Sequence, residues 1–142
     1  MEIIQSSHGA YQLQYHVVWV CKYRRRILNP GVCQYLRKLF AKLLRSMPGV
    51  KIETIGFDLD HLHMVMAIPL KYSIAGVIGK LKGQSSSQLR EAFEWLSKVY
   101  WKETVVWSPG YFVSSVGLNE QTIKRYVEHQ GRQDSGQLRL QL

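Results

Sequence analysis

The chain has 142 residues, a hydrophobic fraction of 46% and a net charge of +9. This length suits a single domain (1–142) with an ordinary buried core, and no apolar run approaches the roughly 20 residues of a membrane span. The N-terminus lacks the features of a secretory signal, and two cysteines are too few for a disulfide framework or a zinc cluster. We therefore expect a soluble cytoplasmic protein with reduced thiols and weakly ordered tails at 1–10 and 132–142.

The positive charge is concentrated in the N-terminal part of the chain. Residues 1–51 carry nine Lys or Arg and one acid, whereas residues 52–142 carry ten and nine. This uneven excess favours a polyanionic partner, and nucleic acid is the interpretation that we prefer. An anionic membrane is the alternative, but its binding requires a basic amphipathic helix with exposed apolar bulk. A basic protein without any polyanionic partner also fits these numbers.

The first half of the chain predicts three strands and one helix. Aromatic and β-branched residues in 11–23 predict a strand, and a basic loop follows that ends in the turn Pro30–Gly31. Apolar residues spaced by three and four predict an amphipathic helix over 32–47. Alternating patterns predict the next two strands, at 50–58 and 61–69, on either side of a turn.

The second half predicts a long helix, a strand and a final helix. Ser73 is placed to cap the long helix, 74–100, which we expect to bend or break near Gly83. The remaining elements are a strand at 110–117 and a helix at 120–130 that Asn119 caps and Gly131 closes. This order predicts an α+β fold of the ferredoxin-like βαββαβ type, with an antiparallel sheet, helices on one face and an added C-terminal helix.

Two histidines, His61 and His63, lie two positions apart in the third predicted strand. Side chains at this spacing point to the same face, about 6–7 Å apart, so both imidazoles can converge on one divalent ion with open positions for substrate oxygens. Hydrogen bonding of both rings within the fold is the alternative, and spacing alone favours it. Asp60 is placed to orient an imidazole, although a role in the preceding turn suits it equally.

A third ligand has to come from another element, and the final helix offers candidates. Tyr126 and Gln130 are four residues apart, so they share one face of that helix. This places a nucleophilic hydroxyl beside an amide carbonyl that can bind a hard ion. Packing of the Tyr126 ring against its apolar neighbours is the alternative, and it is favoured in the absence of other information.

Five stretches of this sequence, in this order, resemble the single-tyrosine HUH transposases of the smallest prokaryotic insertion sequences. They are "YHVVWVCKYRRRIL", "DHLHMVMAIP", "IGKLKGQSSSQLR", "WSPGYFVSSVG" and "IKRYVEHQ". The name HUH denotes His, hydrophobic, His, and His61-Leu62-His63 fits it. The resemblance extends from about Tyr15 to Gln130, which is nearly the whole chain.

The resemblance implies that His61, His63 and Gln130 bind Mg²⁺ or Mn²⁺ and that Tyr126 attacks a phosphodiester of single-stranded DNA. The products it implies are a 5′-phosphotyrosine and a free 3′-OH, and a later attack by a DNA 3′-OH rejoins the strand. It also implies a prokaryotic homodimer that recognises hairpin-bearing element ends, in which the final helix of one chain can complete the active site of the other. A domesticated or non-catalytic nucleic-acid-binding module on the same fold is the alternative.

Basic and aromatic side chains supply candidate DNA contacts. Those expected to grip phosphates after the first strand are Lys22, Arg24, Arg25 and Arg26, and those expected to extend this surface from the long helix are Lys80, Lys82 and Arg90. Tyr23 and Trp19 are candidates for stacking on exposed bases, although a tryptophan in a strand more often belongs to the core.

Overall fold

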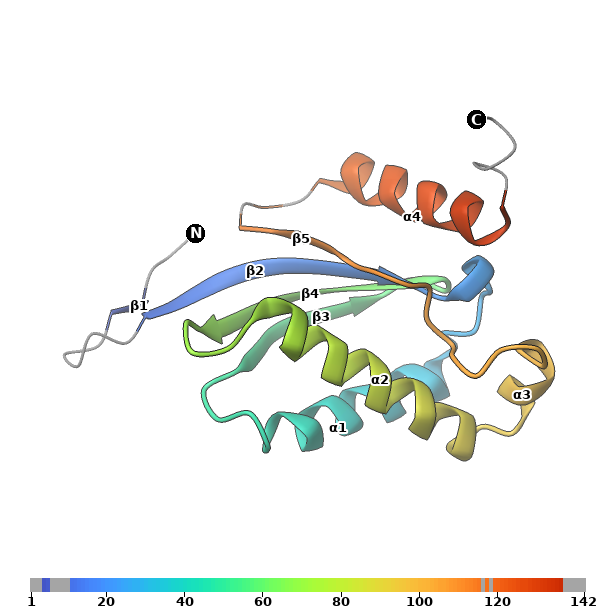
Figure 1. Cartoon of the computed structure of the whole chain (residues 1–142), viewed down its shortest axis with the longest axis horizontal. Helices are drawn as coiled ribbons and strands as arrows, with labels where there is room; N and C mark the ends of the chain where they lie inside the picture. The colour runs from blue at the N-terminus through green and yellow to red at the C-terminus, as the bar shows by residue number, and fades with distance from the viewer. Residues whose placement is uncertain (1–3, 6–10, 116, 118, 137–142) are drawn as a thin grey trace.

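A computed structural model describes residues 4–5, 11–115, 117 and 119–136, and its centre is an antiparallel sheet (Figure 1). The central strand β2 (Tyr11–Val20) pairs with β4 (His61–Pro69), which pairs in turn with β3 (Lys51–Phe57). The other edge of β2 carries β5 (Phe112–Ser114) and the short β1 (Ile4–Gln5). The order β5-β2-β4-β3 is that of a split βαβ sheet, which confirms the predicted ferredoxin-like fold.

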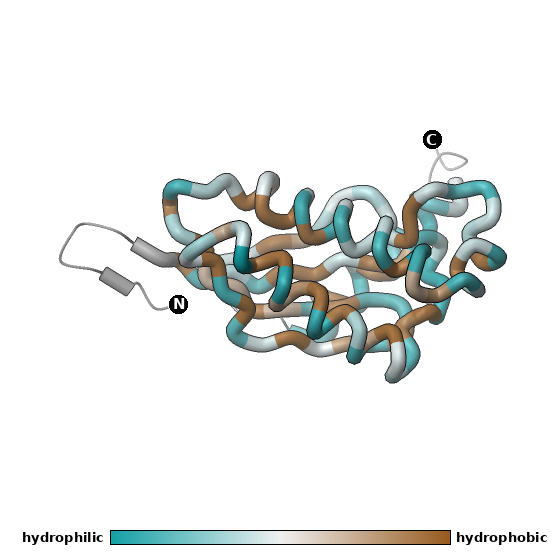
Figure 2. The backbone as a smooth tube through the Cα atoms, turned by 90° about the horizontal axis from the view of Figure 1, so that it is seen from below, coloured by the Kyte–Doolittle hydropathy of each residue, from teal (hydrophilic) through white to brown (hydrophobic). Residues whose placement is uncertain are grey.

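The helices form a layer on each face of this sheet. Helices α1 (Pro30–Leu44) and α2 (Ile74–Ala92) cover one face, and α4 (Glu120–Asp134) lies over the opposite face (Figure 1). A short helix, α3 (Trp95–Val99), follows α2. Apolar and polar segments alternate along α1 and α2 (Figure 2), as expected for helices that bury one stripe. In the described part of the chain, no helix is long and apolar enough to cross a membrane.

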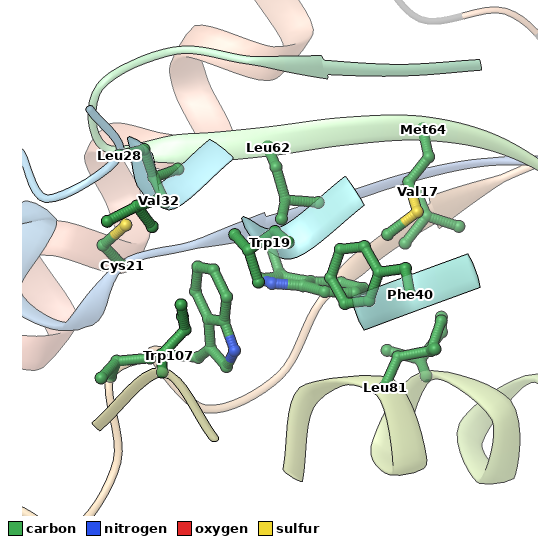
Figure 3. Close-up of a cluster of buried hydrophobic side chains, with 14 of the residues drawn as sticks. Val17, Trp19, Cys21, Leu28, Val32, Phe40, Leu62, Met64, Leu81 and Trp107 are labelled. Carbon is green, nitrogen blue, oxygen red and sulfur yellow. The ribbon is translucent and has the colours of Figure 1, made fainter. Parts of the chain in front are cut away.

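The main hydrophobic core lies between the sheet and the α1–α2 layer (Figure 3). Trp19 of β2 is 0% exposed there, and its ring packs edge-on against those of Phe40 and Trp107, with centroids 6.0 and 5.8 Å away. Trp19 is therefore a core residue, the role that its position in a strand favours, and its enclosed indole is not available to stack on DNA bases. The neighbouring valines, Val18 and Val20, point to the other face of the sheet, toward the α4 layer.

Helices α1 and α2 differ from their predicted forms for local reasons. Pro30 opens α1 instead of closing a turn, because Asn29 caps the helix by accepting the Val32 N–H at 2.9 Å and proline fits the first helical position. Helix α2 is unbroken at Gly83 and ends at Ala92. Its apolar stripe packs on the core, and this tertiary packing outweighs the weak helix propensity of its glycines and serines.

The ends of the chain also differ from expectation where they are described. Helix α4 continues through Gly131 to Asp134, so the prediction that Gly131 closes the helix is wrong. The segment Ile4–Gln5, expected within a weakly ordered tail, pairs with β2. The rest of the two predicted tails, at 1–3, 6–10 and 137–142, lies outside the described residues.

Candidate active site

His61 and His63 project together from the sheet face that carries α4. In the register of the sheet, His61 lies opposite Val20 and His63 opposite Val18, and both valines point away from the α1–α2 core. Both imidazoles line one cavity of about 1110 Å³. The turn after β2 forms part of its wall, through Tyr23, Arg24 and Arg26, and the rest includes one side of α4.

Two carboxylates hold the His61 ring. Asp60 Oδ1 lies 2.8 Å from Nδ1, and Asp58 Oδ2 lies 2.9 Å from Nε2. Asp60 also accepts a hydrogen bond from Arg24 Nε at 3.2 Å. The hydrogen bond with His61 is the largest influence on the Asp60 carboxyl, and together with that from Arg24 it outweighs partial burial and lowers the pKa. The contact required for Asp60 to orient a ligand imidazole is therefore present.

A glycine of the neighbouring strand makes room for the second imidazole. Gly56 of β3 lies opposite His63 in the sheet. A Cβ atom at this position would come within 2.6 Å of His63 Nε2 and 2.5 Å of Cε1. The position of the His63 ring therefore depends on the absence of a side chain at Gly56.

Tyr126 and Gln130 line a different cavity, of about 520 Å³, together with Lys22 and the loop around Gly110. The Tyr126 ring packs against Phe112 of β5, with centroids 5.6 Å apart and planes tilted by 53°. Burial, and to a lesser degree the negative charge of Asp134, raises the pKa of Tyr126 to about 12. In this arrangement the phenol is protonated at neutral pH and is a weak nucleophile.

Within one chain, the candidate catalytic residues are therefore separated by α4. The two histidines lie on one side of this helix, and Tyr126 and Gln130 face the other side. The helix turns by about 100° per residue, so Lys124, Val127 and Glu128 face the histidine cavity while Tyr126 and Gln130 face the second one. Among the described residues, no group of three or more His, Cys, Asp and Glu side chains is arranged to hold a metal ion. The histidine pair has two suitable nitrogen donors and lacks the predicted amide ligand within the same chain.

Comparison with known proteins places the chain in a family. Residues 9–130 match the sequence profile described as "Transposase IS200 like". The chain belongs to this family. The transposase for insertion sequence element IS200 of Salmonella typhimurium (strain LT2) is 34% identical over 128 residues, which cover 90% of this chain and 83% of the relative. The ISDra2 transposase TnpA of Deinococcus radiodurans is 28% identical over 131 residues, 92% of each chain.

Solved structures agree with this membership. A Deinococcus radiodurans chain assigned as a transposase superimposes with a TM-score of 0.71 at 27% identity, covering 84% of this chain and 92% of that chain. A REP-associated tyrosine transposase bound to a REP hairpin shares the fold, with a TM-score of 0.54 at 16% identity, over 90% of this chain and 66% of that chain. Membership of the IS200-like transposases implies a DNA endonuclease and strand-transfer activity, and the resemblance found in the sequence is confirmed.

In this IS200-like transposase, the C-terminal end of α4 is anchored by Asp134. Its carboxylate, 2% exposed, accepts hydrogen bonds from Ser108 Oγ at 2.8 Å and from the Tyr23 N–H at 3.0 Å. Lys22 Nζ lies 3.7 Å from the same group. Asp134 thus joins the tyrosine-bearing helix to the short 3₁₀ turn η1 (Lys22–Arg24) and to the loop before β5.

The turn η1 has an unusual backbone that matches this contact. Tyr23 and Arg24 both adopt left-handed conformations, with φ of 57° and 53°. Such angles are costly for residues other than glycine and persist where the surroundings fix them. Here they direct the Tyr23 N–H toward Asp134 and pass the Arg24 side chain beneath Gly131, where a Cβ atom would overlap Arg24 Cγ and Cδ.

The predicted DNA-binding residues of α2 make contacts within the fold. Lys80 donates to Ser46 Oγ at 2.6 Å, in the helix layer on the opposite face of the sheet, and Arg90 donates to the Tyr100 carbonyl at 3.4 Å. Lys82 is half-buried and donates to the carbonyls of Ser108 and Gly110, and this burial lowers its pKa to about 8. These contacts fit a structural role, and DNA binding by the three residues stays a prediction.

Several residues of this site are not evident in the sequence pattern. Asp58, three residues before His61, lies in a predicted turn, and nothing local distinguishes a turn carboxylate from one that contacts an imidazole. Asp134 lies beyond the predicted end of the final helix. Its spacing of four from Gln130 and eight from Tyr126 is the available signal, because it places all three on one helical face.

Proposed function

We propose that this transposase nicks and rejoins single-stranded DNA through a covalent bond between Tyr126 and a 5′ phosphate, at a site that contains His61 and His63. The observation that carries the proposal is the joint projection of both imidazoles into a large cavity that Arg24 and Arg26 also line. That cavity combines nitrogen donors for a divalent ion with cationic groups for a phosphate backbone. The family implies the nuclease and strand-transfer classes of reaction, and the residues that line the cavity support its assignment as their site.

The reaction conserves the energy of the DNA bond. Tyr126 Oη attacks the scissile phosphorus and forms a P–O bond, while the bond from phosphorus to the 3′ oxygen breaks. That oxygen keeps the electron pair and takes a proton from solvent to become a free 3′-OH, and the phenolic proton passes to solvent. In the second step a DNA 3′-OH attacks the phosphorus and loses its proton to solvent, while the bond to Tyr126 Oη breaks and the phenolate takes a proton from solvent. No external energy source is required, since one phosphodiester bond is exchanged for another.

His61, His63 and Gln130 are the proposed ligands of Mg²⁺ or Mn²⁺. When bound, the ion supplies polarisation of the scissile phosphate and stabilisation of charge on the departing 3′ oxygen. The donors fit such an ion: two imidazoles face one cavity, and Asp60 holds the Nδ1 side of His61. The exposed Asp58 carboxylate at Nε2 has to give way to it.

A second copy of the chain is the proposed source of Tyr126 and Gln130. In a single chain both residues face away from the histidines, and the half-buried Tyr126 ring packs against Phe112. Because Tyr126 and Gln130 share one face of α4, a change in the position of this helix alone would bring both the nucleophile and the amide ligand to the histidines of the other chain. A homodimer with shared sites achieves this without refolding the sheet.

The proposed phosphate contacts are Arg24 of η1 and the next two residues, Arg25 and Arg26. Arg24 and Arg26 line the histidine cavity, and Arg25 is an exposed neighbour. Replacing all three with alanine is expected to flatten the salt dependence of binding, by roughly 0.7 in the log–log slope for each lost contact with single-stranded DNA. An unchanged slope would place the DNA on another surface.

The decisive experiment is detection of a covalent protein–DNA adduct. Wild-type chain, Mn²⁺ and labelled single-stranded element ends are expected to give an adduct that survives denaturing electrophoresis. Tyr126→Phe is expected to give none while still binding DNA. Tyr111→Phe, which removes a hydroxyl from the same cavity, is the matched control and is expected to keep the adduct. An adduct in Tyr126→Phe would exclude Tyr126 as the nucleophile.

One alternative function is a non-catalytic nucleic-acid-binding module on the same fold. It is favoured by the fact that carboxylates contact both nitrogens of His61. In that case the ring is a structural hydrogen-bonding group. Titration with Mn²⁺ separates the two functions, because only the catalytic proposal requires binding that is lost in His61→Ala and His63→Ala. His129→Ala, at an exposed histidine on α4, is the control.

A further inference from the structure

We propose that Trp101 is a stacking platform for a base of the single-stranded DNA that passes over η1, an inference that rests on the proposed function. Trp101 is 72% exposed, whereas Trp19 and Trp107 are 0% and 3% exposed. A single exposed apolar side chain is ordinary on a protein surface, so the inference rests on the attachment of this ring to η1 and on the cations around it. Lys102 Nζ lies over its ring, 4.7 Å from the centroid.

Trp101 is attached to the turn that borders the histidine cavity. The preceding residue, Tyr100, is buried and donates its hydroxyl to the Lys22 carbonyl at 2.9 Å. The Lys22 N–H donates to the Val106 carbonyl at 2.8 Å, and Tyr23 Oη donates to Glu103 at 2.7 Å. These three hydrogen bonds fix segment 100–106 against η1. Both lie at the end of the molecule that also carries α3 (Figure 1).

The chemistry of this surface suits unpaired nucleotides. Tyr23 lines the histidine cavity and is 37% exposed, with Lys22 Nζ 5.2 Å from its ring centroid. Aromatic rings interleaved with ammonium groups accept bases on their faces and phosphates beside them, and this recognition is independent of base identity. Base pairs within a duplex already stack on their neighbours, so an isolated surface ring favours single strands.

The nearby charges agree with a polyanionic ligand. Lys98 and Lys102 are exposed within three residues of Trp101 along the chain. Glu103 is also present, and its carboxylate accepts the Tyr23 hydroxyl. A DNA strand leaving the cavity past Arg24 and Tyr23 thus meets further cations and a second aromatic ring. A protein partner is less favoured, because the exposed apolar group is here bordered by lysines.

The test compares DNA with and without bases. Binding of labelled oligothymidylate and of an abasic strand of equal length is measured by fluorescence anisotropy, without metal, for the wild-type chain and Trp101→Ala. Stacking predicts that Trp101→Ala weakens binding of oligothymidylate about 5- to 150-fold and leaves binding of the abasic strand unchanged. Trp101→Tyr, which keeps an aromatic face, is expected to restore most of the affinity.

A control variant and a measurement of assembly separate base stacking from an indirect effect of the substitution. Leu70→Ala, at an exposed apolar residue just after β4, is expected to bind both strands as the wild type does. Equal losses of Trp101→Ala on both strands, or no loss on either, would overturn the proposal. A change of oligomeric state in Trp101→Ala, seen by sedimentation, would also overturn it by assigning the ring to a contact between protein chains.

The proposed function is tested independently by the Tyr126 adduct. If base-dependent binding requires Trp101 and the wild-type chain forms no adduct, the stacking platform stands and the catalytic proposal fails. If the adduct forms and Trp101→Ala binds oligothymidylate as the wild type does, only the stacking platform fails.

Discussion

The Asp58 carboxylate lies 2.9 Å from Nε2 of His61, so this nitrogen is already engaged. Asp60 holds the opposite nitrogen, Nδ1, at 2.8 Å. The two contacts differ in kind, because the Asp58 side chain is 64% exposed and that of Asp60 is 17% exposed. An incoming divalent ion can displace the exposed carboxylate while the more buried one keeps the ring oriented.

This asymmetry predicts opposite results for two otherwise similar substitutions. Asp60→Asn is expected to weaken Mn²⁺ binding by about 10- to 100-fold, the loss typical when the partner of a ligand histidine is removed. Asp58→Asn is expected to leave Mn²⁺ affinity within a few-fold of wild type. Calorimetric titration of both variants checks this, and an equal loss in the two would contradict the assignment of the orienting role to Asp60 alone.

Gly56→Ala is expected to impair the metal site without removing a ligand. The new methyl group would occupy space now held by the His63 ring, which must rotate away. Mn²⁺ affinity is expected to fall by about tenfold or more, a loss as large as that from a missing hydrogen-bond partner of a ligand. Gly79→Ala, on α2 where a Cβ meets no atom within 4 Å, is the control. Wild-type Mn²⁺ binding by Gly56→Ala would contradict the placement of His63.

Asp134→Asn is expected to loosen the tyrosine-bearing helix. The variant loses the charge that the Tyr23 N–H, Ser108 and Lys22 share. A buried charged hydrogen-bonding group of this kind contributes about 1–3 kcal/mol to the free energy of unfolding. Urea denaturation measures that loss, and hydrogen exchange is expected to show faster exchange in α4 than in α2. Unchanged protection of α4 would show that other contacts hold the helix.

The Lys82 ammonium predicts a change of stability with pH. Burial lowers its pKa in the folded chain to about 8, below the unfolded value near 10.5. Between these values the unfolded chain binds more protons, so the contribution of Lys82 to stability rises as pH increases from about 8 to 10.5. The difference in unfolding free energy between wild type and Lys82→Met is expected to change over that range, and a constant difference would contradict the shift.

The sheet and the histidine pair follow from the sequence because both depend on strand periodicity. Alternation in β4 places His61 and His63 on one face, and the register opposite Val20 and Val18 agrees. The continuity of α2, in contrast, does not follow from the sequence. Its serines have weak helix propensity, and the groups that they hydrogen-bond lie about twenty residues further along the chain. Ser85 Oγ accepts the Trp107 indole N–H, and Ser86 Oγ accepts the Val106 N–H, both at 2.9 Å. These bonds fasten the loop before β5 to the helix.

The orientation of α4 is beyond sequence reasoning for a different physical reason. Both sides of this helix carry groups able to pack, with Val127 on one side and Tyr126 on the other. Gly131, which resembles a helix terminator, instead makes space for Arg24. Local propensity does not encode which side meets the histidines, because that depends on the helix's contacts with η1 and β5.

Mixing two inactive variants tests the shared active site most directly. Tyr126→Phe and His63→Ala chains, distinguishable by size, are combined, allowed to exchange subunits, and incubated with Mn²⁺ and labelled single-stranded element ends. If Tyr126 of one chain acts at the histidines of another, neither variant alone forms an adduct, and the mixture forms one on the His63→Ala chain. A mixture that stays inactive while the wild type forms an adduct would contradict the shared site.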